Sequence, residues 1–156
     1  MRADFPIRPG ALDDVEMIVA HRRAMFRDMG HLDEDSLDKM CQAFRPWLER
    51  KMRDAEYLAW FAVDSGGAIA AGVGLWLMDW PPHMLAPGAP RGNILNVYTR
   101  PQNRRHGLAR RLMETAIDWC RANHVRAVIL HSSDDGRRLY ESMGFRATNE
   151  MRILLE

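Results

Sequence analysis

The segment Arg104–Arg110 has the composition of a phosphate-binding turn. It contains arginines, a histidine and Gly107, and it leads into an amphipathic helical pattern with Leu108, Leu112 and Met113 on the apolar stripe. The first turn of such a helix has backbone N–H groups without internal partners and the positive end of the macrodipole, so it would present donors to an anion. Gly107 has no Cβ, which would let a phosphate approach the backbone closely. We therefore predict a phosphate cradle at residues 104–110.

Two common phosphate motifs do not describe this cradle, because the chain lacks both G-x-x-x-x-G-K-[ST] and G-x-G-x-x-G. The segment instead resembles the R/Q-x-x-G-x-G/A signature of the GNAT superfamily of acyl-CoA-dependent N-acyltransferases, which is matched by Arg104-Arg105-His106-Gly107-Leu108-Ala109. A second segment, about thirty residues later, resembles the L-Y-E-x-x-G-F stretch of the same superfamily and reads Leu139-Tyr140-Glu141-Ser142-Met143-Gly144-Phe145. The two motifs occur in the order expected for that superfamily.

The resemblance implies acetyl-CoA as the acyl donor and assigns roles to particular residues. Coenzyme A would be bound by Val97, Tyr98, Thr99, Arg104, Arg105, His106, Gly107, Leu108, Ala109, Arg110 and Ser133. The backbone of Val97–Thr99 would pair with the pantetheine arm and donate a hydrogen bond to the oxyanion. Tyr140 would protonate the departing thiolate, a role that suits a phenol with a pKa of about 10. The alternative for Tyr140 is an amphipathic-helix residue with its hydroxyl at the surface.

Three positions depart from the pattern of many relatives. Ser133 stands where they have asparagine, Gly136 where they have alanine, and Val128 where some carry a glutamate base. A serine hydroxyl can still donate one hydrogen bond, but valine has no basic group. Substitute bases, acting directly or through water, would be Asp79, His83 or His131.

Periodicity and turn residues predict the elements that hold these groups. Strands are expected at Phe5–Arg8, 57–63, 68–78, Ile94–Thr99, Arg126–His131 and Met151–Leu155, with a hairpin turn at 64–67. Helices are expected from an N-cap at Asp13 to Gly30, from about Ser36 to Asp54, from the cradle onward, and between 132–135 and Gly144. Pro46 should kink or divide the second helix.

The resemblance implies an α/β (α+β) fold with a mixed, mostly antiparallel sheet and helices on both faces. The sheet would split between the strand ending at Thr99 and the strand ending at His131, leaving a cofactor cleft. In the superfamily the first two helices help to wall the acceptor pocket, whereas burial statistics alone would place Phe26, Phe44 and Trp47 in the core. The proline-rich stretch 79–90 is expected to be a loop, either beside the acceptor or simply solvated.

Length and composition place the chain among ordinary globular proteins. Its 156 residues fit a single domain, 1–156, and are 47% hydrophobic and 28% charged. A net charge of +1 provides no strong field for nucleic acid or membrane. Cys41 and Cys120 are too few for a disulfide framework or a metal cage, and neither a basic leader nor a long apolar run is present. These features predict a cytoplasmic protein without a metal centre.

Arginine is concentrated near the cradle even though the total charge is close to zero. No acidic residue lies between Asp79 and Glu114, a stretch that contains Arg91, Arg100, Arg104, Arg105, Arg110 and Arg111. These side chains form either a solvated face or a basic mouth for a polyanionic cofactor. A nucleic-acid site is disfavoured because the cluster lacks interleaved aromatic residues for base stacking.

The leading hypothesis is an N-acetyltransferase that moves an acetyl group from acetyl-CoA to a primary amine of a small molecule, or to an amino-terminal group. The alternative is an acyl-CoA-binding sensor module without turnover, consistent with the missing base. The resemblance also leaves a homodimer open, since dimers are common in the superfamily. Thiol release from acetyl-CoA over a panel of amines would separate the two hypotheses.

Overall fold

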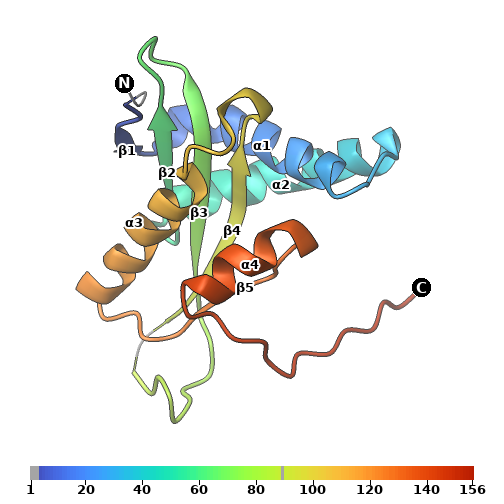
Figure 1. Ribbon diagram of the computed structural model, residues 1–156. Coiled ribbons are helices and arrows are strands. Elements are labelled where there is room, and N and C mark those ends of the chain that lie inside the picture. Colours follow the sequence, from blue (N-terminus) through green and yellow to red (C-terminus); the bar gives the residue numbers. More distant parts are fainter. Residues whose placement is uncertain (1–3, 89) are drawn as a thin grey trace.

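A five-stranded sheet forms the centre of the computed structural model, which describes residues 4–88 and 90–156 (Figure 1). The strands lie in chain order: β1 (Ile7–Pro9), β2 (Tyr57–Val63), β3 (Ile69–Met78), β4 (Arg91–Thr99) and β5 (Val128–Leu130). The first four are antiparallel neighbours, and β5 runs parallel to β4. The predicted hairpin at 57–78 and the mixed, mostly antiparallel sheet are confirmed.

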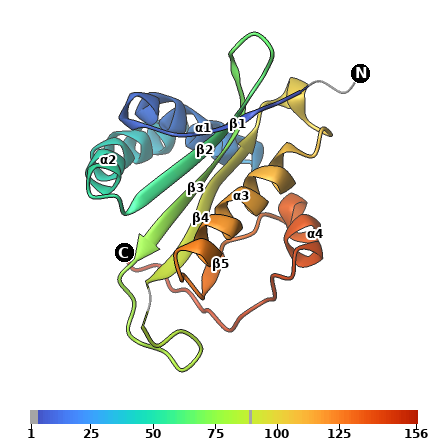
Figure 2. The ribbon, with the colours of Figure 1, turned by 90° about the vertical axis from the view of Figure 1, so that its left-hand side faces the viewer.

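Helices cover both faces of the sheet (Figure 2). On one face α1 (Val15–Asp28) and α2 (Glu34–Arg53) pack against the side chains of Tyr57, Ala59 and Phe61 from β2. On the other face α3 (Leu108–Ala122) buries its apolar stripe against β2, β3 and β4, and α4 (Asp134–Ser142) lies beside it. Amphipathic helices and a two-sided strand pattern dictate this three-layer arrangement, because each apolar face needs a partner.

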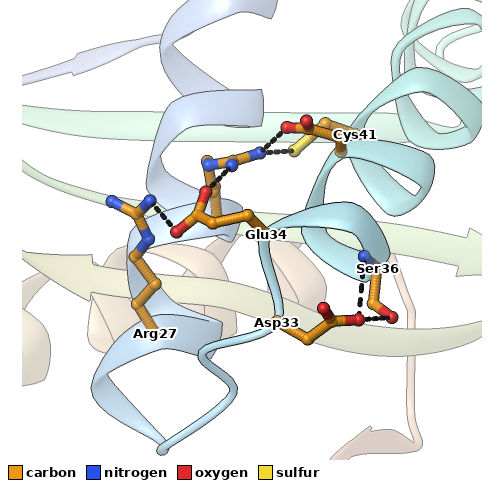
Figure 3. A network of polar contacts seen from close by, with 7 residues as sticks. Arg27, Asp33, Glu34, Ser36 and Cys41 are labelled. Carbon is orange, nitrogen blue, oxygen red and sulfur yellow. Dashed lines mark hydrogen bonds and ion pairs between the residues drawn. The ribbon is translucent and has the colours of Figure 1, made fainter.

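The connection between α1 and α2 is held by ion pairs (Figure 3). Arg23 contacts both Glu34 and Asp38, the latter at 2.6 Å, and Arg27 contacts Glu34. Asp33 caps α2 by accepting a hydrogen bond from the backbone N–H of Ser36 at 3.2 Å. Two of the three arginines at 22, 23 and 27 of α1 are therefore neutralised at this turn.

The sheet splits between β4 and β5, as expected. The two strands pair only from Gly92 with Val128 to Ile94 with Leu130. Beyond Ile94, the β4 edge that faces β5 has no strand partner among the described residues, while the opposite edge still pairs with β3 up to Thr99. The backbone at the end of β4 is therefore free to pair with a ligand.

A β-bulge in β4 lies just past the point where β5 stops pairing. Gly74 stands opposite Leu95 and Gly72 opposite Tyr98, so Val73 alone faces two residues of β4. One of them is Asn96, whose φ of 55° lies in the left-handed region that asparagine tolerates better than most residues. A bulge bends its strand and increases the local twist, which turns the end of β4 away from β5.

Three expectations from the sequence are wrong. Met151–Leu155 is not a strand: Met151 and Ile153–Leu155 are 79–94% exposed, and an apolar segment forms a strand only beside a neighbouring edge. Figure 1 shows this segment leading away from the sheet. Of the two effects expected of Pro46, a kink or a division of the helix, the division does not occur, because α2 runs unbroken past it. The N-cap position of α1 is Asp14 rather than Asp13, and the Asp14 side chain makes no capping hydrogen bond, because it pairs with Arg8 and accepts from the N–H of Ala11 at 2.8 Å instead.

The remaining elements agree with the expectations to within a few residues. Gly144 ends the α4 turn with φ 97°, and the N–H of Phe145 folds back to the carbonyl of Tyr140 at 3.0 Å. The predicted loop at 79–90 contains no helix or strand among its described residues, residue 89 lying outside them. Both cysteines are buried free thiols. Within 4–88 and 90–156, no helix has the length and apolar character needed to cross a bilayer.

Candidate active site

Six consecutive backbone amides at the cradle are without backbone acceptors. The N–H of Arg104 bonds to Pro101, and the next donor with a backbone partner is that of Arg111, which reaches the carbonyl of Gly107 at 3.2 Å. The described residues therefore offer no backbone acceptor to the N–H groups from 105 to 110. Such a row of donors at the start of a 15-residue helix is suited to binding a phosphate or pyrophosphate group.

Gly107 is required by its backbone conformation rather than by crowding. It is the N-cap of α3 with φ 71°, in the left-handed region, and apart from its two chain neighbours no described residue has an atom within 4 Å of the position where a Cβ would be. Only a ligand on the six amides would make this space restricted.

The side chains of the cradle have different surroundings. Arg104 donates to the carbonyl of Thr99 at 3.1 Å and pairs with Asp28 at the end of α1. His106 donates from Nδ1 to the carbonyls of Asn103 and Arg104, at 3.0 and 2.9 Å, because two carbonyl partners require a proton on that nitrogen. Leu108 is buried in the core, which leaves its N–H as the group that can meet a ligand.

Two arginines remain suited to an anion. The exposed side chain of Arg105 has no hydrogen bond or ion pair among the described residues. Arg110 links α3 to α4 through Ser142 at 2.5 Å and lies 3.9 Å from Glu114. The predicted basic mouth is smaller than the sequence indicated, because Arg91 stacks on Trp80 at 4.1 Å, at the opposite end of β4.

Ser133 and Tyr140 are placed by α4. Ser133 is the N-cap, and its Oγ accepts from the N–H of Gly136 at 3.2 Å, so its own O–H is left to donate. Tyr140 is half-buried, and burial raises the pKa of its phenol. Its ring lies over Gly136, where a Cβ would come within 2.8 Å of the ring. Glycine in place of alanine at 136 thus makes room for Tyr140.

The three candidate bases differ in their distance from the split. Asp79 and His83 follow Met78, which pairs with Arg91 at the start of β4. Arg91 precedes the bulge residue Asn96 by five residues, a separation of roughly 16 Å along an extended strand. His131 directly follows Leu130, whose partner is Ile94, and therefore lies at the mouth of the split. Its Nε2 is 3.1 Å from Glu150. Chain position brings only His131 close to the free edge of β4.

Sequence reasoning missed a buried polar cluster behind the bulge. Asn96 donates from Nδ2 to the hydroxyl of Tyr57 at 2.8 Å and accepts from Nη1 of Arg22 at 2.8 Å. Burial raises the pKa of Tyr57, and burial lowers the pKa of Arg22. The partners lie 39 and 74 residues from Asn96 in the sequence, so no local pattern could have indicated the cluster.

Comparison with known proteins identifies the family. The sequence profile described as the acetyltransferase (GNAT) family matches residues 17–145. The chain belongs to this family. No curated protein sequence matches it. A GCN5-related N-acetyltransferase from Ralstonia eutropha JMP134 is 37% identical, with 97% of this chain and 98% of that chain covered and a TM-score of 0.91.

More distant GNAT structures share the fold. A predicted acetyltransferase from Clostridium acetobutylicum, whose crystal structure contains acetyl-CoA, is 22% identical, with 97% and 96% of the two chains covered and a TM-score of 0.85. A glucosamine-6-phosphate N-acetyltransferase from Arabidopsis thaliana is 18% identical, with 97% of each chain covered and a TM-score of 0.65. GNAT membership implies acyl-CoA-dependent acetyl transfer.

Proposed function

We propose that this GNAT protein transfers an acetyl group from acetyl-CoA to a primary amine of a small molecule, or to an amino-terminal group, by direct attack. The observation that carries the proposal is the free edge of β4 at Val97–Thr99, which is followed in the chain by the unpaired cradle amides. Val97 and Tyr140 pack against the same core cluster, so the free edge and the phenol share one side of the sheet.

The cradle residues fit the pyrophosphate of coenzyme A. The N–H groups from 105 to 110 would donate to its oxygens, and Arg105 and Arg110 would add positive charge. The pantetheine arm carries amide groups, which can pair with the free N–H and C=O groups of Val97–Thr99 as a neighbouring strand would. Ser133 would add one O–H donor from the α4 cap.

The reaction needs one bond formed and one broken. The lone pair of a neutral amine attacks the thioester carbon, and a backbone N–H of Val97–Thr99 donates to the oxyanion that develops. Collapse of the tetrahedral intermediate breaks the carbon–sulfur bond, and the thiolate takes the phenolic proton of Tyr140. The ammonium proton leaves to water, with His131 as the nearest candidate base, and solvent reprotonates Tyr140.

Tyr140→Phe tests the acid role. The hydroxyl makes no hydrogen bond among the described residues, so its loss should change the melting midpoint by less than about 2 °C. An acid role predicts that kcat for thiol release falls roughly 10²-fold or more while coenzyme A affinity is retained. Burial raises the pKa of Tyr140 above its usual range, which keeps the wild-type phenol in the protonated form that an acid requires.

Two results would count against the proposal. Near-wild-type turnover of Tyr140→Phe across pH 6 to 9 would remove the phenol from the mechanism. Coenzyme A binding without thiol release on any amine would instead favour a cofactor-binding sensor module. Calorimetric titration with coenzyme A separates these cases, since it measures binding independently of turnover.

A further inference from the structure

Arg22 is a half-buried cation that no carboxylate neutralises. Its guanidinium lies over two aromatic rings, 5.1 Å from the ring centre of Phe26 and 4.7 Å from that of Phe44. Among the described residues its one hydrogen bond runs from Nη1 to Oδ1 of Asn96, and its Nε is buried without an acceptor. Aromatic faces attract a guanidinium but accept none of its in-plane N–H groups, so most of its donors are unpaired.

The other two arginines of α1, unlike Arg22, both have acidic partners. Arg23 is held by Glu34 and Asp38, and Arg27 by Glu34 (Figure 3). No acidic side chain in the described part of the chain comes within ion-pairing distance of Arg22. Burial of an unpaired charge is costly, so an uncompensated guanidinium at this depth indicates that its counter-charge arrives with a ligand.

The free donors of Arg22 are on the edge of the guanidinium that suits a carboxylate. Nε and Nη2 point the same way along one edge, and neither has an acceptor among the described residues. Arg45 uses that same edge to hold Glu16, with Nε at 2.6 Å and Nη2 at 3.0 Å from its two oxygens. A carboxylate or phosphate could bind Arg22 in the same bidentate way. Because Nε is beneath the surface, the side chain must move slightly outward to do so.

Arg22 also lies next to the place where acetyl transfer would occur. Its partner Asn96 forms the bulge, two residues past the last β4–β5 pair and one residue before Val97. An amine that approaches the free edge of β4 from the α1 side would therefore pass Arg22. The cradle, which would take the phosphates of coenzyme A, begins eight residues after Asn96, beyond the end of β4.

We propose that Arg22 determines acceptor specificity by binding an anionic group, a carboxylate or a phosphate, that the acceptor amine carries. This inference rests on the proposed function for its reaction, but the anion site is a property of Arg22, Asn96 and the two aromatic rings. Phe26 and Phe44 orient the guanidinium, and Asn96 fixes one of its nitrogens. The acceptor is thus an amino acid-like or phosphorylated amine rather than a neutral or polycationic one.

The test uses two pairs of amines that differ in the anionic group: L-leucine with L-leucinamide, and O-phosphoethanolamine with ethanolamine. Wild type, Arg22→Met and Arg22→Lys are compared with Arg27→Met, which removes an equal charge from the same helix outside the site. Thiol release gives kcat/KM for each amine, and calorimetry on the coenzyme A-saturated protein gives each Kd. Arg22→Lys keeps the charge if the methionine variant does not fold.

We expect one anionic amine to exceed its neutral partner by about 10- to 100-fold in kcat/KM or in affinity. That ratio should collapse in Arg22→Met, fall less in Arg22→Lys, and persist in Arg27→Met. The leucine pair responds if the anion is a carboxylate, and the ethanolamine pair responds if it is a phosphate.

Some outcomes would overturn the proposed role of Arg22, and one would overturn only the proposed acetyltransferase function. Equal binding and turnover of charged and neutral partners by the wild type would overturn it, as would an unchanged ratio in Arg22→Met. An equal fall in kcat for all amines would assign Arg22 to catalysis instead. Arg22-dependent binding of an anionic amine without any turnover would retain the anion site and reject the acetyltransferase proposal.

Discussion

Replacement of Gly74 by alanine should strongly destabilise the protein, because the hydroxyl of Tyr57 occupies the space of the missing side chain. A Cβ at position 74 would lie 1.9 Å from the Tyr57 hydroxyl oxygen and 2.5 Å from Cζ. Ordinary contacts between such atoms are about 3.5 Å, so the overlap is roughly 1.5 Å. Tyr57 is only 2% exposed and packs edge-on against Trp47, so it cannot move aside easily.

We expect Gly74→Ala to lower the free energy of unfolding by about 3 kcal/mol or more, as for severe overpacking. For a chain of this length that corresponds to a fall in melting midpoint of roughly 6–12 °C. Urea unfolding followed by circular dichroism measures the change. Gly88→Ala is the matched control, because apart from its chain neighbours no described residue has an atom within 4 Å of the added Cβ, and it should stay within about 0.5 kcal/mol of wild type.

The double variant isolates the contact between these two residues. Tyr57→Phe alone should cost about 1–3 kcal/mol, since the Nδ2 of Asn96 then loses its buried partner. In the Tyr57→Phe background the hydroxyl oxygen is absent, so the nearest atom to the added Cβ is the ring carbon Cζ. The cost of Gly74→Ala should therefore fall by at least about 1 kcal/mol. Costs that add within about 0.5 kcal/mol, or a neutral Gly74→Ala, would refute the reasoning about how the bulge is packed.

Two further predictions concern the cradle and the buried histidine. Gly107→Glu adds bulk and like charge at the unpaired amides, so coenzyme A affinity in calorimetry should fall at least tenfold with the fold retained; unchanged affinity would place the phosphates elsewhere. Burial, with a smaller effect of Arg100, lowers the pKa of His21 from 6.5 to about 4. The unfolded chain then binds more protons between these values, so stability should drop by about 2 kcal/mol from pH 7 to 5, and urea unfolding of His21→Gln should not show this drop.

Local features of the sequence determined much of the secondary structure and the cradle. Helical periodicity, Gly107 at the start of α3 and Gly144 after α4 act within one or two turns, so they are visible without knowledge of the fold. The hairpin from Tyr57 to Met78 is equally local, because its turn residues and the apolar runs that flank them are consecutive in the chain. Resemblance to a known family then related these parts to a split sheet.

Tertiary structure alone decided the details around the transfer site. The bulge at Asn96 depends on a hydroxyl from β2 and a guanidinium from α1, contacts that no window of the sequence contains. The same is true of the candidate bases, since sheet register places His131 at the split and leaves Asp79 about five residues away. Candidate bases that the sequence could not rank are thus ranked by their position in the sheet.

Met151–Leu155 shows where prediction from the sequence failed. Four of its five residues are apolar, yet no neighbouring strand among the described residues supplies hydrogen bonds, and the apolar side chains remain exposed. A helix satisfies its backbone within its own sequence, so helix positions could be predicted from periodicity and caps. A strand, a bulge or a buried polar cluster is completed by residues from elsewhere in the chain, and for that reason only the folded structure determines them.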